Sequence, residues 1–229
     1  MWKNLSAADL FAIAANLLPV YGVWALGWNP REIFLIYCLE SLIIGFFTLV
    51  KMGITTSVKK KDVWENNGSK TIVHGTFFMF FFLIHYGFFM IIQIFIFSKS
   101  MSLSGKEMSV WDFLFHWPQY LGTEGYVVLG IFILAYGYKN LSGFILSGEY
   151  KTAVLSSIMF EPYIRVFIQQ ITVILGSFVL LFNGGKVFIL LFAFIRIYFE
   201  VILKYDVRIK EALKAKSNES NKKIADAEN

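Results

Sequence analysis

The chain has 229 residues, of which 57% are hydrophobic, 18% are aromatic and only 16% are charged. So few charged residues leave too little polar surface to cover a water-soluble globule, and the composition excludes an ordinary soluble domain. The net charge of +5 does not indicate nucleic-acid binding, because the basic residues flank apolar runs instead of lining one face of a domain. The single cysteine, Cys38, lies within an apolar run, so an intrachain disulfide is excluded.

Six apolar stretches are long enough to cross a bilayer, whose hydrocarbon core of roughly 30 Å requires about 20 helical residues. They are residues 10–28, 33–52, 72–97, 126–146, 158–182 and 187–203. The first resembles a signal peptide but lacks a small-residue cleavage site, so we expect an uncleaved span. The sequence predicts an all-α fold, an integral membrane bundle of about six transmembrane helices in residues 1–205, followed by a polar tail in residues 206–229.

The basic residues of the connections predict how the spans are oriented in the cell membrane. The connection from Lys51 to Lys70 carries five lysines, whereas residues 29–32 and 183–186 carry one basic residue each. Basic connections stay in the cytoplasm, so this connection, both chain termini and residues 139–151 are expected inside. The lysine-rich tail agrees with this topology.

Three shorter features are predicted from local patterns. The aromatic stretch around Trp111, within residues 98–124, is too short to span and is expected to lie at the outer interface. Pro19 predicts a kink in the first span, and Pro162 predicts a helix start at the cytoplasmic end of the fifth. Residues 149–160 are expected as an ordinary interfacial loop, with a re-entrant segment as the alternative.

Several ionisable residues lie inside the predicted spans, where they should be costly. A charge near the bilayer centre costs roughly 2.5 to 3.5 kcal/mol on insertion scales. The last span carries two charges and is therefore expected to need a partner helix. The ionisable residues within spans are Glu40, His85, Arg165, Arg196 and Glu200.

Depth within the spans suggests that four helices bring polar groups together. Glu40, His85 and Arg196 lie within about a turn of the midplane, with Gln169 and Gln170 nearby. We hypothesise that Glu40 pairs with Arg196 and that His85 and the two glutamines complete the network. In the same cluster, either Glu200 or Glu161 is expected to engage Arg165. On the second span, Ser41 and Gly45 form a small-residue pair that permits close helix approach.

The buried polar cluster allows three classes of function. The leading hypothesis is transport or binding of a small solute or ion. The rival is a structural or assembly subunit in which the charges serve only packing, and the third is an intramembrane enzyme. No cofactor or metal is predicted, because His85 and Glu40 alone offer only two ligands and no second span supplies a histidine for haem. The lipid bilayer is the expected partner, and oligomeric state is not inferred.

The chain resembles an uncharacterised family of small polytopic membrane proteins from bacteria and archaea, classed as a domain of unknown function. The resemblance covers roughly residues 10–205 and implies a fold and topology without any catalytic residue. A lysine and an aspartate four residues apart stand in that family where this chain has Arg196 and Glu200, which keeps the charges but changes their reach. The motifs are Asn16 to Val23 with Pro19, Tyr37 to Glu40 followed by Ile44-Gly45-Phe46, His85-Tyr86-Gly87 with Phe89, and Pro162-Tyr163 with Arg165.

Overall fold

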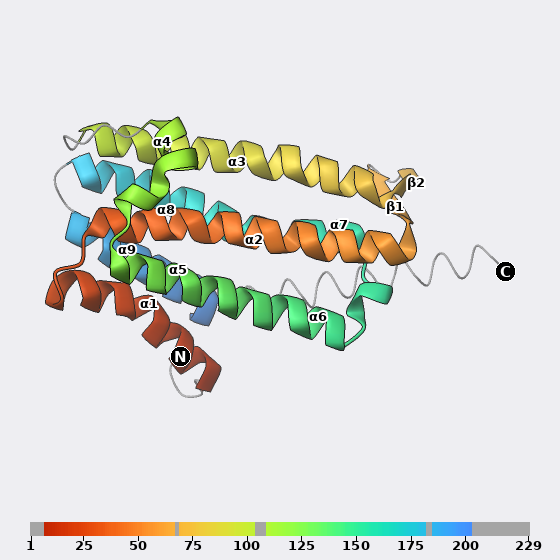
Figure 1. The fold of residues 1–229 in the computed structure, drawn as a ribbon, viewed down its shortest axis with the longest axis horizontal. Helices are drawn as coiled ribbons and strands as arrows, with labels where there is room; N and C mark the ends of the chain where they lie inside the picture. The colour runs from red at the N-terminus through yellow and green to blue at the C-terminus, as the bar shows by residue number, and fades with distance from the viewer. Residues whose placement is uncertain (1–6, 67–68, 104–108, 182–184, 203–229) are drawn as a thin grey trace. The chain divides into compact units, whose positions relative to one another are not determined.

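The protein is mostly helical, as a computed structural model that describes residues 7–66, 69–103, 109–181 and 185–202 shows (Figure 1). The predicted α-helical class is therefore confirmed, although the described residues also contain a β-hairpin that the sequence did not suggest. The chain divides into two compact units, which are described separately. The first comprises the described parts of Met1–Ser41, Phe89–Gly130 and Arg165–Tyr205, and the second those of Leu42–Phe88 and Ile131–Ile164.

The first two helices have clear end signals. Helix α1 spans Ala7–Ala25 and runs through Pro19. The chain leaves the helix through Gly27, two residues after its end, whose φ of +73° suits a residue without a Cβ. Helix α2 spans Pro30–Lys59 and begins with proline at its first position, where the missing N–H costs nothing. It extends seven residues beyond the predicted end of the second span at residue 52.

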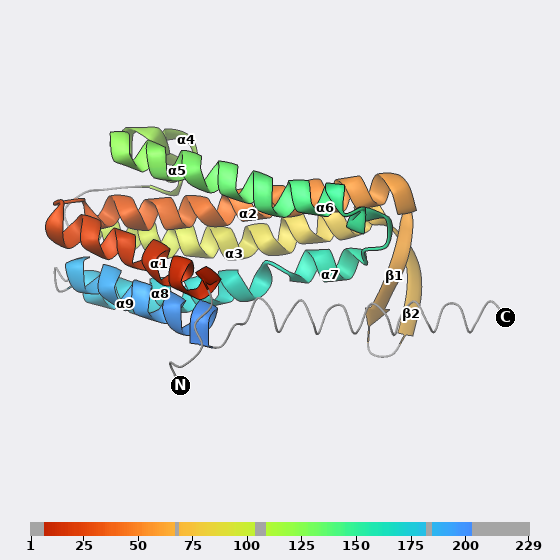
Figure 2. The same cartoon turned by 90° about the horizontal axis from the view of Figure 1, so that it is seen from below.

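A two-stranded antiparallel hairpin occupies much of the segment predicted as a loop. Strands β1, Lys61–Asn66, and β2, Ser69–His74, lie side by side in Figure 2 and connect α2 to helix α3, Gly75–Leu103. The third helix therefore begins at Gly75, and the predicted start at residue 72 was wrong. Val63, Ile72 and Val73 are β-branched residues that favour strands, a local signal that hydropathy over a long window averages away.

The segment after α3 contains the expected short aromatic helix. Helix α4 spans Val110–His116 and is followed by the 3-10 turn η1, Trp117–Tyr120. Ser109 and Asp112 form a capping box, in which each side chain accepts a hydrogen bond from the other's backbone N–H. The Ser109 hydroxyl also donates to the Asp112 carboxylate at 2.7 Å, and this hydrogen bond and that from the Ser109 backbone lower the pKa of Asp112.

The fourth predicted span is helical throughout, with a change of helix type at residues Gly137–Ser142. Residues 149–160, expected as a loop, form two short helical pieces instead. The elements are α5, Thr123–Tyr136, the π-helical η2, Gly137–Ser142, α6, Gly143–Leu146, the 3-10 turn η3, Glu149–Lys151, and α7, Leu155–Phe160.

The last two helices follow the predicted spans closely. Helix α8 spans Tyr163–Leu181 and starts directly after Pro162, as the proline predicted. Helix α9 spans Gly185–Ile197 and continues as the π-helical turn η4, Tyr198–Ile202. The predicted polar tail, residues 206–229, lies outside the described residues.

Aromatic packing holds the first unit together. Helix α1 lies alongside α9 (Figure 2). Between α2 and α9, Phe34 meets Phe188 edge-on at 4.9 Å between ring centroids, and Tyr37 stacks on Phe192 at 4.0 Å. Stacked and edge-on ring pairs stabilise packing beyond the area that they bury.

In the second unit, a buried acid anchors the hairpin. Asp62 accepts a hydrogen bond from the backbone N–H of Leu155, the first residue of α7, at 2.8 Å. Its carboxylate also lies 3.3 Å from the Lys59 ammonium, which in turn donates to the Ala153 carbonyl at 3.1 Å. One acid therefore satisfies a free N–H at the start of α7 and fixes the beginning of β1.

A close approach between α2 and α3 in the second unit depends on Gly45. A Cβ at this position would lie 2.6 Å from Cε1 of Tyr86, a buried ring that stacks on Phe82. We therefore expect Gly45→Ala to lower the free energy of unfolding by about 1 to 3 kcal/mol, because the ring has little room to move. Gly87→Ala is the matched control in α3, since a Cβ there meets nothing within 4 Å and should stabilise the helix. Denaturant unfolding in detergent measures both changes in stability. An equal change in the free energy of unfolding for the two variants would contradict the close contact between Gly45 and Tyr86.

Candidate functional site

The most buried charges in the first unit form an ion pair. Two Nη atoms of Arg196 donate to two carboxylate oxygens of Glu40, at 3.1 and 3.2 Å. The side chain of Glu40 is only 2% exposed and that of Arg196 12% exposed. The pair predicted from sequence is therefore formed, and in the two-bond geometry that compensates best for the loss of water.

Aromatic rings surround the guanidinium of Arg196. Its Cζ lies 5.1 Å from the centroid of Tyr37 and 5.6 Å from that of Phe192, and these two rings stack on each other. A delocalised, weakly hydrated guanidinium suits such faces better than a lysine ammonium does. Arginine at this position is thus favoured both by the carboxylate and by the rings.

Gln169 links α8 to α2 with both ends of its amide. Its Oε1 accepts from the Ser41 hydroxyl, and its Nε2 donates to the backbone carbonyl of Tyr37. Ser41 is fully buried and Gln169 nearly so, so both polar groups are satisfied away from solvent.

The neighbouring glutamine faces a different helix and is only half satisfied. Gln170 donates from Nε2 to the backbone carbonyl of Phe89 at 2.6 Å, and Gln93, fully buried one turn further along α3, donates to Sγ of Cys38 at 3.4 Å. Among the described residues, no hydrogen-bond partner reaches Oε1 of Gln170 or Oε1 of Gln93. Two buried carbonyl oxygens therefore remain able to accept a hydrogen bond.

These contacts join four helices of the first unit through what we call the polar layer. Its charges are one carboxylate and one guanidinium, which neutralise each other, and its remaining members are uncharged. The arrangement can stabilise helix packing, and the carbonyl oxygens of Gln93 and Gln170, which no described residue occupies, can accept hydrogen bonds from a small donor. The polar layer comprises Cys38, Glu40 and Ser41 from α2, Gln93 from α3, Gln169 and Gln170 from α8, and Arg196 from α9.

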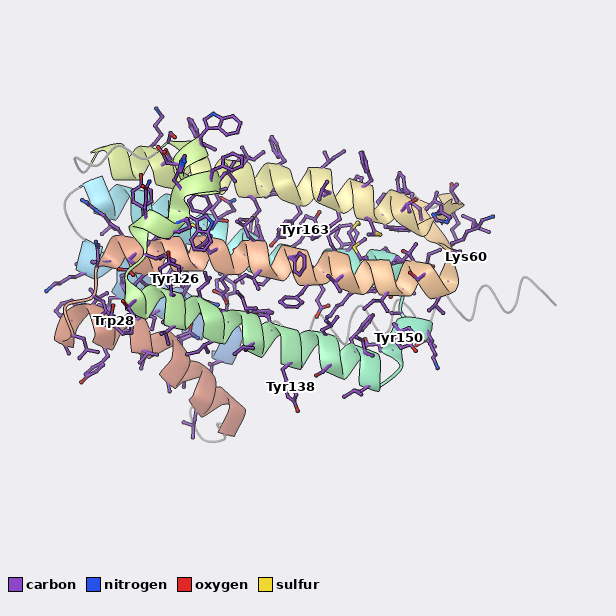
Figure 3. The ribbon with its side chains drawn as sticks, viewed as in Figure 1. Trp28, Lys60, Tyr126, Tyr138, Tyr150 and Tyr163 are labelled. Carbon is purple, nitrogen blue, oxygen red and sulfur yellow. The ribbon has the colours of Figure 1, made fainter. Side chains whose placement is uncertain are left out.

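His85 belongs to the second unit, where its side chain is exposed. Its Nδ1 lies 2.8 Å from the hydroxyl of Tyr163, which is labelled in Figure 3, and its ring stacks on Phe81 at 5.4 Å. The expectation of a buried histidine beside the glutamines is corrected: counting from the predicted start at residue 72 gave its depth in the span but not the direction of its side chain.

Glu161 also lies in the second unit, with a partner that the sequence did not suggest. Its carboxylate is 3.3 Å from the ammonium of Lys51, which also lies 5.4 Å from the centroid of Phe144. Lys51 was assigned to a loop, but it lies within α2 and is buried. The side chains of Arg165 and Glu200, the other predicted members of the cluster, lie outside the described residues.

Sequence reasoning missed Gln93 and the roles of Cys38 and Ser41 in the polar layer. Gln93 interrupts a strongly apolar stretch of α3, which is the same signal that singled out Glu40. It could have been found if neutral polar residues had been considered together with ionisable ones. Cys38 carries no such signal, because cysteine is common in apolar cores.

The described residues thus form a helical protein with a neutral polar layer, and they include no group of three or more His, Cys, Asp or Glu side chains able to hold a metal ion. The chain belongs to a family of unknown function, DUF6498, whose model matches residues 3–221. Membership of an uncharacterised family, which the motifs predicted, is confirmed. Neither curated proteins nor solved structures gave a match to the chain.

Exchanging the charges of the buried pair tests its role in stability. Glu40→Arg or Arg196→Glu alone leaves two like charges facing each other, and we expect either change to cost about 3 to 5 kcal/mol or to prevent accumulation of the folded protein. The double exchange should recover part of this loss, though not all, because the rings favour arginine at position 196. Thermal unfolding in detergent measures the recovery. The control is Glu124→Arg, at an exposed position of the same unit, which should have little effect on the unfolding temperature. If the double variant recovers no stability, Glu40 and Arg196 are not coupled.

The two adjacent glutamines of α8 provide a second, internally controlled comparison. Gln169→Met removes two buried hydrogen bonds, one from the Ser41 hydroxyl and one to the Tyr37 carbonyl, which should cost about 2 to 3 kcal/mol. Gln170→Met removes one hydrogen bond but also an unpartnered carbonyl, so it should cost about 1 kcal/mol or less. Denaturant unfolding compares the two. An equal loss for Gln170→Met would mean that its Oε1 holds a donor, either water or a solute, in the folded protein.

Proposed function

We propose that the chain is a multi-pass protein of the cell membrane with about six spanning helices. Two described helices, Pro30–Lys59 and Gly75–Ile96, are long and apolar enough to cross a membrane. A core helix of a soluble protein can pass the same test, but it would be mostly buried. Only 28% of the most apolar stretch of α3 is buried, which favours a helix that faces lipid.

The exposed side chains of α3 support this proposal by their spacing. They recur every three or four residues, so they form one stripe along the helix, about 27 Å long at 1.5 Å per residue. That length is close to the hydrocarbon thickness of a bilayer, and an apolar stripe of this size in water would drive aggregation. The stripe consists of Phe77, Phe80, Ile84, Phe88, Ile91 and Phe95, whereas Phe78, Phe82, Tyr86, Met90 and Ile94 on the other side are buried.

Other helices present similar side chains. Leu134 in α5 and Leu146 in α6 are 74% and 84% exposed, and Tyr138, which points away from the ribbon in Figure 3, is 80% exposed. Phe167 in α8 and Phe194 in α9 are also largely exposed. Lipid-facing stripes on several helices fit a bundle that crosses the membrane repeatedly, with both termini in the cytoplasm as the positive-inside pattern suggests.

For the molecular activity, we propose that the polar layer binds a small polar solute or ion during its passage through the membrane. The observation that carries this proposal is that two buried carbonyl oxygens, on Gln93 and Gln170, have no hydrogen-bond partner among the described residues. Unpaired buried acceptors cost free energy in a low-dielectric interior, so their retention indicates that a donor or cation visits them. The Glu40–Arg196 pair would hold the helices around this position without adding net charge.

A second candidate is a purely structural role, as a subunit whose charges lock helices together. The two-bond geometry of Glu40 with Arg196 favours it, because a fully compensated pair needs no ligand. The two candidates differ in whether water reaches the polar layer. Transport requires that it does so at some point of the cycle, whereas packing requires a permanently dry layer.

Cys38 is a natural probe for this difference, because it is the only cysteine in the sequence and its Sγ lies in the polar layer, where it accepts a hydrogen bond from Gln93. In proteoliposomes, we expect a small methanethiosulfonate reagent to modify Cys38, because only a hydrated thiol ionises and reacts. The matched control is Cys38→Ala with Ala193→Cys, which places the thiol at an equally buried, apolar position of the same unit. Cys38 should react about tenfold faster or more. Resistance to extraction by carbonate would show that the chain is inserted in the membrane. If both thiols are then equally unreactive, the structural role is favoured.

A further inference from the structure

The hairpin between α2 and α3 has one face packed against its own unit. Because side chains alternate along a strand, Asp62 and Trp64 share one face of β1. Asp62 is held by Leu155 and Lys59 as described above, and the indole of Trp64 packs against three rings of α3. The centroid distances are 5.4 Å to Phe77, 5.6 Å to Phe78 and 5.4 Å to Phe81.

The opposite side of the hairpin, which we call the outward face, combines lysines with an exposed apolar centre. The strand register pairs Lys61 with His74, Val63 with Ile72 and Glu65 with Lys70. Lys61, Lys70 and His74 are exposed, and Ile72 is 72% exposed. A further exposed lysine, Lys60, lies between α2 and β1 and is labelled in Figure 3. An apolar centre with a basic rim is the pattern of a surface that meets a membrane interface.

The connection to α2 and α3 limits where this face can lie. Only Lys60 separates α2 from β1, and α3 begins directly after β2. If the two helices span the membrane, as the proposed function states, strands of six residues extend at most about 20 Å from the ends of those helices. The outward face therefore stays within reach of the lipid headgroups throughout.

We propose that the outward face binds the anionic phospholipid headgroups of the cytoplasmic leaflet, with Ile72 inserted at the boundary with the acyl chains. Two exposed lysines of this face, Lys61 and Lys70, together with Lys60 beside it, supply positive charge that complements phosphate. A lysine near an anionic leaflet increases affinity by about fivefold at physiological salt. Burial of Ile72 adds an apolar term that a purely electrostatic contact would lack.

The experiment uses the full chain with an environment-sensitive dye attached through Ile72→Cys in a Cys38→Ala background. The labelled protein is reconstituted into nanodiscs of phosphatidylcholine alone or of phosphatidylcholine with phosphatidylglycerol. We expect the dye emission to shift to the blue only when phosphatidylglycerol is present, and high salt should reduce the shift. Lys61→Gln with Lys70→Gln should raise the phosphatidylglycerol content needed for half of the shift by about an order of magnitude.

The matched control is Lys99→Gln with Lys186→Gln, which removes the same charge outside the hairpin. This variant should behave like the parent. An emission that is equally shifted in both lipids, an emission typical of water in both, or a normal response of the Lys61/Lys70 variant would overturn the proposal. The water-like result would favour a protein partner for the outward face. Failure of the chain to insert into nanodiscs at all would instead contradict the proposed function, so the two failures are distinct.

Discussion

The removal of one carboxylate and one guanidinium from water is the constraint on which the first unit depends. Glu40 is 2% exposed, and an unpaired charge at such a site would cost several kcal/mol. Arg196 can compensate only if α9 lies against α2 with its side chain at one height and in one orientation. The rings of Tyr37 and Phe192 then fill the space around the guanidinium. The ion pair therefore specifies which faces of α2 and α9 meet as well as holding them together.

The two glutamines of α8 show how one helix serves two neighbours. Consecutive residues of a helix point about 100° apart, so Gln169 reaches α2 while Gln170 reaches α3. The first amide is satisfied at both ends, which is what a packing contact requires. The second amide donates to α3, but among the described residues no partner reaches its carbonyl oxygen, and the same holds for the carbonyl oxygen of Gln93. Among the described residues of the layer, the two carbonyl oxygens that lack a hydrogen-bond partner are therefore those of Gln93 on α3 and of the glutamine that contacts α3.

Hydropathy and charge predicted the helical class, the approximate position of each long helix and the Glu40–Arg196 pair, although α2 and α3 extend several residues beyond their predicted ends. These succeeded because apolar runs of about 20 residues and charges inside them are strong, local signals. The hairpin was missed because twelve strand residues lie between two long apolar helices and resemble a polar loop in composition. The direction of His85 was missed because depth along a span does not determine the side of the helix. Lys51 was placed in a loop because its charge outweighed the helical pattern that continues to Lys59.

The five lysines between positions 51 and 70, which in the sequence form one topology signal, divide into two groups with different physical roles. Lys51 and Lys59 form ion pairs with Glu161 and Asp62, so their charges are largely neutralised at short range. The group formed by Lys60, Lys61 and Lys70 is exposed at the hairpin. Charges that are already paired contribute little to the field at a membrane surface. Lys60, Lys61 and Lys70 therefore carry the exposed positive charge at this end of the chain, while Lys51 and Lys59 connect α2 to their acidic partners.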